Sequence, residues 1–277
     1  MKNLRERTAI LTGANGGLGA YMANALAAQG MNLLLVAFPG VGLEDLQAAA
    51  MERGVQARVL NADLREPAER VRVVEYARQE FGHVDVLVNN AGVEFSAAYH
   101  ELTEDQILEV LKVNLEAPLI LTRLVLPGML ERRQGHIVNI SSLAGKSGPG
   151  YQEPYAATKA ALTAFTFSLR GTYQGTGISA SVVCPGFVET GIYARLKAKT
   201  GCAAPTLLSA CRPERVARAV VRAIRGDIPE IIVSRFPVRP VLVLAALSPR
   251  LGEWISGCIG VHRFFRKAAE AEKRARG

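Results

Sequence analysis

The sequence TAILTGANGGLGAYMANALAAQG, residues 8–30, decides the fold. Its first five residues form a short apolar run that predicts a β-strand, and residues 20–30 have the composition of a helix. Between them Gly13 permits a tight turn, Gly17 lets a pyrophosphate approach the backbone, and Gly19 lets the helix pack on the strand. A phosphate would bind at the amino terminus of this helix, next to Asn15 and Leu18. Because glycine turns also join strands to helices for structural reasons alone, this unit needs support from the rest of the chain.

The remainder of the chain alternates apolar strands with helices. We expect further strands at 32–38, 57–60, 84–89, 137–142, 178–184 and 231–233. We expect helices at 43–53, 67–81 and 213–225, and helices that begin near Thr103 and Tyr155. This order predicts an α/β fold: a single-domain, Rossmann-type doubly wound parallel sheet of about seven strands with helices on both faces.

Length and composition agree with one globular unit. The 277 residues are 49% apolar and 21% charged, and no linker or low-complexity tract divides them. We expect residues 1–235 to form the dinucleotide-binding and catalytic domain. Within it the pattern loosens over residues 191–212, which we interpret as a flap over the substrate. Residues 236–277 are expected to form a helical extension packed on the same domain.

The charge and the cysteines restrict the function classes. The net charge of +8 comes from scattered basic residues, which favours an anionic cofactor over nucleic acid. The four cysteines have no metal-binding spacing, so we expect reduced thiols, no metal site and a cytoplasmic location. The amino terminus has no long apolar segment and predicts no secretory signal.

A second stretch, IVNISSLAGKSGPGYQEPYAATKAA at residues 137–161, carries the candidate chemistry. Tyr155 and Lys159 are four residues apart, so on a helix they share one face. A fixed positive charge beside a phenol stabilises phenolate and lowers its pKa from about 10, which makes the phenol a usable proton carrier. One such pair can arise by chance, but Ser142 follows a strand at the sheet edge where α/β proteins bind ligands.

Other polar residues follow the carboxyl ends of expected strands. Asp63 and Leu64 follow the third strand, and the sequence Asn90-Ala91-Gly92 follows the fourth. These strand ends are also compatible with plain turns. Asn114 lies among apolar neighbours in a helix, where a structural amide and a catalytic residue are both compatible with the sequence.

Residues 5–235 resemble the short-chain dehydrogenase/reductase family in their motifs and in the order of those motifs. The motifs are TGANGGLG, NADL, NNAG, Asn114, Ser142, YAATK and PGFVET. The resemblance implies that Tyr155 is the general acid/base, Lys159 lowers its pKa and binds the nicotinamide ribose, and Ser142 polarises the substrate carbonyl. It also implies that Asn114 organises a water in a proton relay. The cofactor contacts that it implies, with those from the glycine turn, are Gly13, Asn15, Gly17, Leu18, Gly19, Ala37, Phe38, Asp63, Leu64, Asn90, Ala91, Gly92, Tyr155, Lys159, Pro185, Gly186, Val188 and Thr190.

The chain departs from the family at Ala37-Phe38. Relatives that use NAD usually carry an acidic residue at the first position, and those that use NADP often carry a basic residue at the second. Without a carboxylate to repel a 2′-phosphate, the sequence leaves NADP and NAD open and favours NADP.

We therefore expect an NAD(P)-dependent oxidoreductase that interconverts a secondary alcohol and a ketone. The apolar flap and tail suggest a hydrophobic substrate, and the resemblance suggests a homodimer or homotetramer. Two alternatives remain: a catalytically silent dinucleotide-binding sensor or scaffold, and a membrane-peripheral protein attached through its basic, apolar tail. The tail is too broken to span a bilayer, and a subunit contact or a lid over an apolar pocket is a simpler interpretation of it than membrane attachment.

Overall fold

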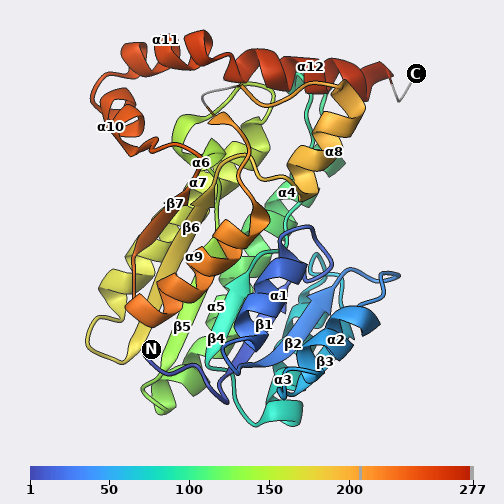
Figure 1. Cartoon of the computed structure of the whole chain (residues 1–277), viewed down its shortest axis with the longest axis vertical. Coiled ribbons are helices and arrows are strands. Elements are labelled where there is room, and N and C mark those ends of the chain that lie inside the picture. The colour runs from blue at the N-terminus through green and yellow to red at the C-terminus, as the bar shows by residue number, and fades with distance from the viewer. Residues whose placement is uncertain (206–207, 275–277) are drawn as a thin grey trace.

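The computed structural model describes residues 1–205 and 208–274 and contains one parallel sheet of seven strands (Figure 1). The strand order is β3-β2-β1-β4-β5-β6-β7, so the order reverses between β1 and β4. In sheets of this kind the ligand crevice lies at that reversal. The strands are β1 (Thr8–Thr12), β2 (Asn32–Ala37), β3 (Ala57–Asn61), β4 (Val86–Asn89), β5 (Gly135–Ile140), β6 (Ile178–Pro185) and β7 (Glu230–Val233).

Helices connect the strands and cover both faces of the sheet. They are α1 (Gly19–Ala27), α2 (Glu44–Met51), α3 (Pro67–Phe81), α4 (Glu104–Leu111), α5 (Ala117–Glu131), α6 (Ala144–Ser147), α7 (Glu153–Thr172), α8 (Gly191–Thr200), α9 (Pro213–Gly226), α10 (Arg239–Leu247), α11 (Pro249–Ile259) and α12 (Val261–Arg274). The described residues also include the 3-10 turn η1 (Tyr99–Glu101) and the π-helical turn η2 (Lys112–Glu116).

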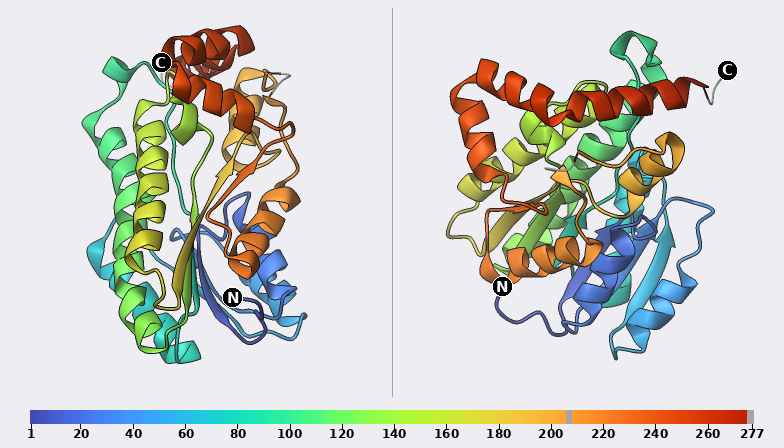
Figure 2. Two further views of the ribbon diagram at one scale, coloured as in Figure 1. Left: turned by 90° about the vertical axis from the view of Figure 1, so that its left-hand side faces the viewer. Right: turned by 45° about the horizontal axis from the view of Figure 1, so that its top comes forward.

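Alternating side chains of the strands supply two hydrophobic cores. Leu33 and Leu35 of β2 pack toward α1 and α9, whereas Leu34 and Val36 pack toward α3 and α5. Successive residues of a strand point to opposite faces, so a continuous apolar strand can fill both cores. The left view of Figure 2 shows the sheet edge-on between these two helical layers.

Most expected elements are present with shifts of a few residues. The helix predicted at 67–81 has those bounds, and the helix expected near Thr103 begins with a capping box between Thr103 and Gln106. The doubly wound parallel sheet of seven strands is confirmed.

The flap differs from its prediction. Where we expected a loose segment, α8 forms an ordered helix from Gly191 to Thr200. Its Tyr193 and Leu196 pack with Phe264 and Phe265 of α12 in a separate hydrophobic cluster. The helix α8 buries its apolar side chains against α12, and the sequence of α8 alone does not indicate this partner. Residues 206–207 of the expected flap lie outside the described residues.

The chain ends in the three helices α10, α11 and α12, which lie together at one end of the molecule (Figure 1). Gly252 of α11 lies close to Ala245 of α10. A methyl group at residue 252 would be 2.8 Å from the Cβ of Ala245. By length and hydropathy, one helical stretch within the described residues, Glu104–Glu131, could cross a membrane. It includes α5, whose Leu121 and Met129 are buried in the core of the domain.

Candidate active site

A cavity of about 810 Å³ opens at the carboxyl edge of the sheet. Residues at or just beyond the ends of β1, β2, β3, β4, β5 and β6 line it, together with residues of α8, α10 and α11. Such a volume is in the range of pockets for cofactors and small ligands. Its position spans the reversal of strand order, as expected for a dinucleotide site.

The glycine turn at the end of β1 forms one wall of this cavity. Gly13 has φ +64°, and a Cβ there would lie 2.8 Å from Ala91 Cα, so the turn excludes a larger residue at this position. A Cβ at Gly17 would lie 2.1 Å from Thr190 Oγ1 and 2.4 Å from Gly191 N. The sequence assigned Gly17 to the approach of a pyrophosphate; in the structure its lack of a side chain admits the loop that carries Thr190.

Asn90, at the end of β4, forms hydrogen bonds that hold the same turn in place. Its side-chain amide donates to the carbonyl oxygens of Thr12 and Gly13, at 3.0 and 2.9 Å. Its backbone N–H and that of Ala91 both donate to Thr12 Oγ1. Asn90 therefore fixes the shape of the glycine turn from the neighbouring strand.

Ser142, Tyr155 and Lys159 come together on the wall formed by β5 and α7. Ser142 lies two residues beyond the end of β5, and Tyr155 and Lys159 share one face of α7, as their spacing predicted. The Ser142 side chain lies near the Tyr155 phenol and favours its ionised form. The Lys159 ammonium lies 5.6 Å from the centre of the Tyr155 ring and donates to the Ile140 carbonyl at 2.9 Å.

The pKa values of Tyr155 and Lys159 are both shifted, that of Tyr155 in the direction opposite to the one that the sequence predicted. Burial raises the pKa of Tyr155 to about 12, the Ser142 side chain opposes this, and Glu94 adds to it. Burial lowers the pKa of Lys159 to about 8. The pKa of Tyr155 is therefore not lowered overall as predicted, because the cost of burying the phenolate outweighs the interactions that stabilise it. With this pKa the Tyr155 phenol is protonated at neutral pH.

Asn114 lies behind the cavity wall in the π-helical turn η2. It is fully buried, and its amide is bonded twice to Val93, which donates to Oδ1 at 2.8 Å and accepts from Nδ2 at 2.9 Å. A methyl group at Gly92 would lie 3.3 Å from Asn114 Oδ1 and 3.6 Å from Lys159 Nζ. Asn114 thus holds the loop that passes between it and Lys159. Single π-helical turns within longer helices often occur at functional sites.

Sequence reasoning missed Arg65, which lines the cavity beyond the end of β3. Its guanidinium lies over the Phe38 ring at 5.3 Å and bonds Asp63 through Nε and Nη2, with distances of 2.6–3.0 Å. NADP-dependent relatives often carry a basic residue at the position of Phe38. In this chain Arg65, stacked on the Phe38 ring, places a positive charge at that site instead. The sequence could have indicated Arg65, because it directly follows Asp63 and Leu64, which were already expected to contact the cofactor.

A buried polar cluster near Tyr155 was also missed. The Glu94 carboxylate is buried and accepts hydrogen bonds from Ser96 at 2.5 Å and from Gln152 at 2.7 Å. Its other oxygen accepts from Arg195 of α8 at 2.7 Å. Gln152 and Arg195 line the cavity. In the sequence, Glu94 is a charged residue between the apolar Val93 and Phe95, which could have indicated a buried carboxylate.

The structure brings nearly all of the sequence-predicted residues to the cavity. Those that line it are Gly13, Asn15, Gly17, Leu18, Ala37, Phe38, Asp63, Leu64, Asn90, Ala91, Gly92, Ser142, Tyr155, Lys159, Pro185, Gly186, Val188 and Thr190. Gly19 and Asn114 lie behind the wall; a Cβ at Gly19 would be 2.2 Å from the Gly13 carbonyl oxygen. No cluster of three or more potential metal ligands occurs in the described part of the chain.

Comparisons with known proteins give the family of this chain. A family model described as short chain dehydrogenase matches residues 7–201. A ketoacyl reductase, HetN, of Nostoc sp. is 37% identical over 276 residues, which are 98% of this chain and 95% of that protein. The 3-oxoacyl-[acyl-carrier-protein] reductase FabG of Escherichia coli is 35% identical over 188 residues, which are 68% of this chain and 76% of that protein.

A solved structure gives the same result. The crystal structure of an actinorhodin polyketide ketoreductase with NADPH superimposes with a TM-score of 0.77 at 31% identity, over 84% of this chain and 97% of that chain. The chain therefore belongs to the short-chain dehydrogenase family and is an oxidoreductase that acts on CH–OH groups.

Proposed function

We propose that the protein reduces the ketone of an apolar substrate to a secondary alcohol with NADPH. The observation that carries this proposal is the placement of Ser142, Tyr155 and Lys159 on the wall of the cavity that also contains the glycine turn. When bound, NADPH supplies the hydride. The residues of the chain supply the proton and the placement.

Each of the three side chains has a role that its geometry supports. Tyr155, protonated at neutral pH, donates its phenolic proton to the substrate oxygen as negative charge develops there. Ser142 lines the same cavity wall as Tyr155, and its single O–H donates the other hydrogen bond to that oxygen. Lys159 is buried beside them and, as an ammonium, stabilises the phenolate that remains.

The glycine turn and Arg65 fit the dinucleotide. The turn places the amino terminus of α1 at the cavity, where unpaired N–H groups favour a phosphate, and no acidic side chain occurs in the first turn of α1. Arg65 and Phe38 would hold the adenosine end. The guanidinium of Arg65 offers hydrogen-bond donors for a 2′-phosphate, which supports NADPH over NADH.

The apolar lining supports a hydrophobic substrate. Beyond Tyr155, the cavity is bounded by Ile192 and Leu196 of α8, Leu242 of α10, and Ile255 and Ile259 of α11. Polar residues that line the same cavity include Ser142, Gln152 and Arg195. A substrate with a ketone near one end and an aliphatic body would contact both groups of residues.

The proposal includes a cytoplasmic homo-oligomer. All four cysteines are free thiols, which supports a reducing compartment. Leu108 and Leu111 of α4 and Phe167 of α7 are exposed apolar side chains on one helical layer. Pairing of two copies through this layer would cover them.

The proposal is tested by following NADPH absorbance with a series of ketones that share one head group and differ in aliphatic chain length. We expect kcat/KM to rise with chain length and NADPH to be preferred to NADH. The same series with Ser142→Ala should lose about 100-fold in kcat. Failure of every ketone with both cofactors would contradict the proposal.

A further inference from the structure

The outward faces of α10 and α11 carry an apolar patch. We define the outer patch as Val243, Leu244, Leu247, Leu251 and Trp254, all of which are large apolar residues and exposed. Leu247 is 78% exposed and Trp254 is 66% exposed. Solvent-exposed clusters of this kind usually mark an interaction site.

The outer patch is separate from the substrate cavity. The cavity is lined by the other face of the same two helices, through Val241, Leu242 and Ala245 of α10 and Ile255 and Ile259 of α11. The two helices are therefore apolar on both sides, whereas a helix that covers only a pocket needs one apolar face. The exposed side must have another partner.

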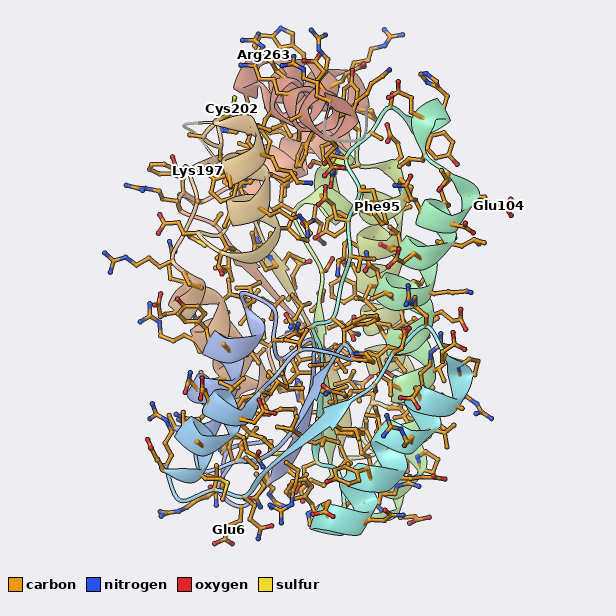
Figure 3. All side chains as sticks on the ribbon, turned by 90° about the vertical axis from the view of Figure 1, so that its right-hand side faces the viewer. Glu6, Phe95, Glu104, Lys197, Cys202 and Arg263 are labelled. Atoms are coloured by element: carbon orange, nitrogen blue, oxygen red, sulfur yellow. The ribbon has the colours of Figure 1, made fainter. Side chains whose placement is uncertain are left out.

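Basic residues flank the outer patch along the chain. Between residues 235 and 267 the chain has six basic residues and one acidic residue, Glu253. The basic side chains, all exposed, are Arg235, Arg239, Arg250, Arg263, Arg266 and Lys267. Figure 3 shows Arg263 on α12 at the end of the molecule opposite to Glu6. Two of the arginines have carboxylate partners, Arg239 with Glu230 and Arg266 with Glu270.

This combination selects one class of partner. A second copy paired symmetrically through the outer patch would bring its arginines next to their equivalents, at an electrostatic cost. An anionic bilayer instead complements the arginines and accepts the leucines and Trp254 at its interface. We propose that α10 and α11 dock this protein peripherally on the surface of an anionic lipid bilayer.

Docking would have a consequence for the substrate, which rests on the proposed function. The same helices separate the bilayer surface from the cavity, so a lipid-soluble ketone could enter between them without crossing water. Membrane binding itself is independent of catalysis, because none of the five patch residues lines the cavity.

Trp254 is the single tryptophan of the chain and reports on the outer patch directly. The full-length protein is titrated with vesicles of phosphatidylcholine alone and with vesicles that contain phosphatidylglycerol, while Trp254 emission and cosedimentation are measured. We expect a blue shift and at least about tenfold stronger binding to the anionic vesicles, reduced by high salt. Leu247→Glu should weaken binding about tenfold or more, whereas Met51→Glu, at an exposed apolar residue of α2, should not.

Two outcomes would overturn the proposal. One is an unchanged Trp254 spectrum and no cosedimentation with either kind of vesicle. The other is a blue shift without vesicles that grows with protein concentration and accompanies a larger sedimenting mass, since a second copy would then cover the patch. Turnover of a water-soluble ketone by Leu247→Glu, measured in parallel, distinguishes loss of docking from loss of the proposed catalytic function.

Discussion

Arg195 of α8 donates a hydrogen bond to the buried carboxylate of Glu94 across 2.7 Å. This ion pair ties the helix that covers the cavity to the loop after β4. Arg195 is about half-exposed, whereas the Glu94 side chain is fully buried and is also bonded to Ser96 and Gln152. The arginine therefore compensates a charge that water cannot reach.

Replacement of Arg195 by Gln should loosen the helix α8 and raise KM several-fold. We expect the free energy of unfolding to fall by about 1–2 kcal/mol, less than for a fully buried pair because solvent screens Arg195. Urea unfolding and steady-state kinetics measure both effects. Lys197→Gln, at an exposed position on the same helix, is the matched control, and equal behaviour of the two variants would contradict the role of the pair.

Arg65 should determine the choice between cofactors. Arg65→Ala removes the guanidinium stacked on Phe38, so we expect NADPH affinity to fall about tenfold or more and NADH affinity to change little. Calorimetric titration of both cofactors gives the ratio. Arg58→Ala, at a surface arginine of β3 that pairs with Glu80, serves as the control. An equal loss of affinity for NADPH and NADH would show that Arg65 does not bind the 2′-phosphate.

Lys159 should make cofactor binding dependent on pH. Burial lowers the pKa of Lys159 to about 8, so its ammonium loses the proton as the pH rises through that value. In the proposed complex, the ammonium is the form that would donate a charged hydrogen bond to the ribose. We expect NADPH affinity to be constant below about pH 7 and to fall about tenfold by pH 9. Calorimetry across this range should show no such decrease for Lys159→Gln, and a decrease of the same size in the variant would assign it to another group.

His136 should make the fold sensitive to acid. Its ring is buried beside Ser181, and burial lowers its pKa from 6.5 to about 3. Below pH 6.5 the unfolded chain binds a proton that the folded protein does not take up until about pH 3. Stability from this group is therefore complete above pH 6.5 and is lost as the pH falls toward 3, by about 1.4 kcal/mol per pH unit.

Urea unfolding at pH 7, 6, 5 and 4 measures this slope. His136→Asn should have a shallower slope over the same range, whereas His100→Asn, at an exposed histidine, should retain the slope of the unaltered protein. Parallel profiles for the His136 variant and the unaltered protein would contradict the assignment.

The sequence predicted the parts of the fold that follow from local patterns. The apolar runs of β2 and β5 predict buried parallel strands, and Thr103 with Gln106 predicts the start of α4. The helix α8 was not predicted, because its apolar residues are few and are buried against α12, far along the chain. Tertiary partners of this kind cannot be read from a local pattern.

The candidate site was predicted in its positions but less well in its energetics. Spacing alone placed Tyr155 and Lys159 on one face of α7. The pKa of Tyr155 depends on burial by segments remote in sequence, so the sequence suggested a lower value where the structure gives a higher one. Arg195 meets Glu94 over a separation of 101 residues, which no sequence spacing could indicate.

The central claim is that Tyr155 donates the proton to the reduced carbonyl. It is tested most directly by Tyr155→Phe, with NADPH binding measured by calorimetry and ketone reduction measured by NADPH absorbance on the same preparation. The account predicts cofactor affinity within about threefold of the unaltered protein and a loss of at least about 100-fold in kcat. A variant that binds NADPH normally and still reduces the ketone at the original rate would contradict it.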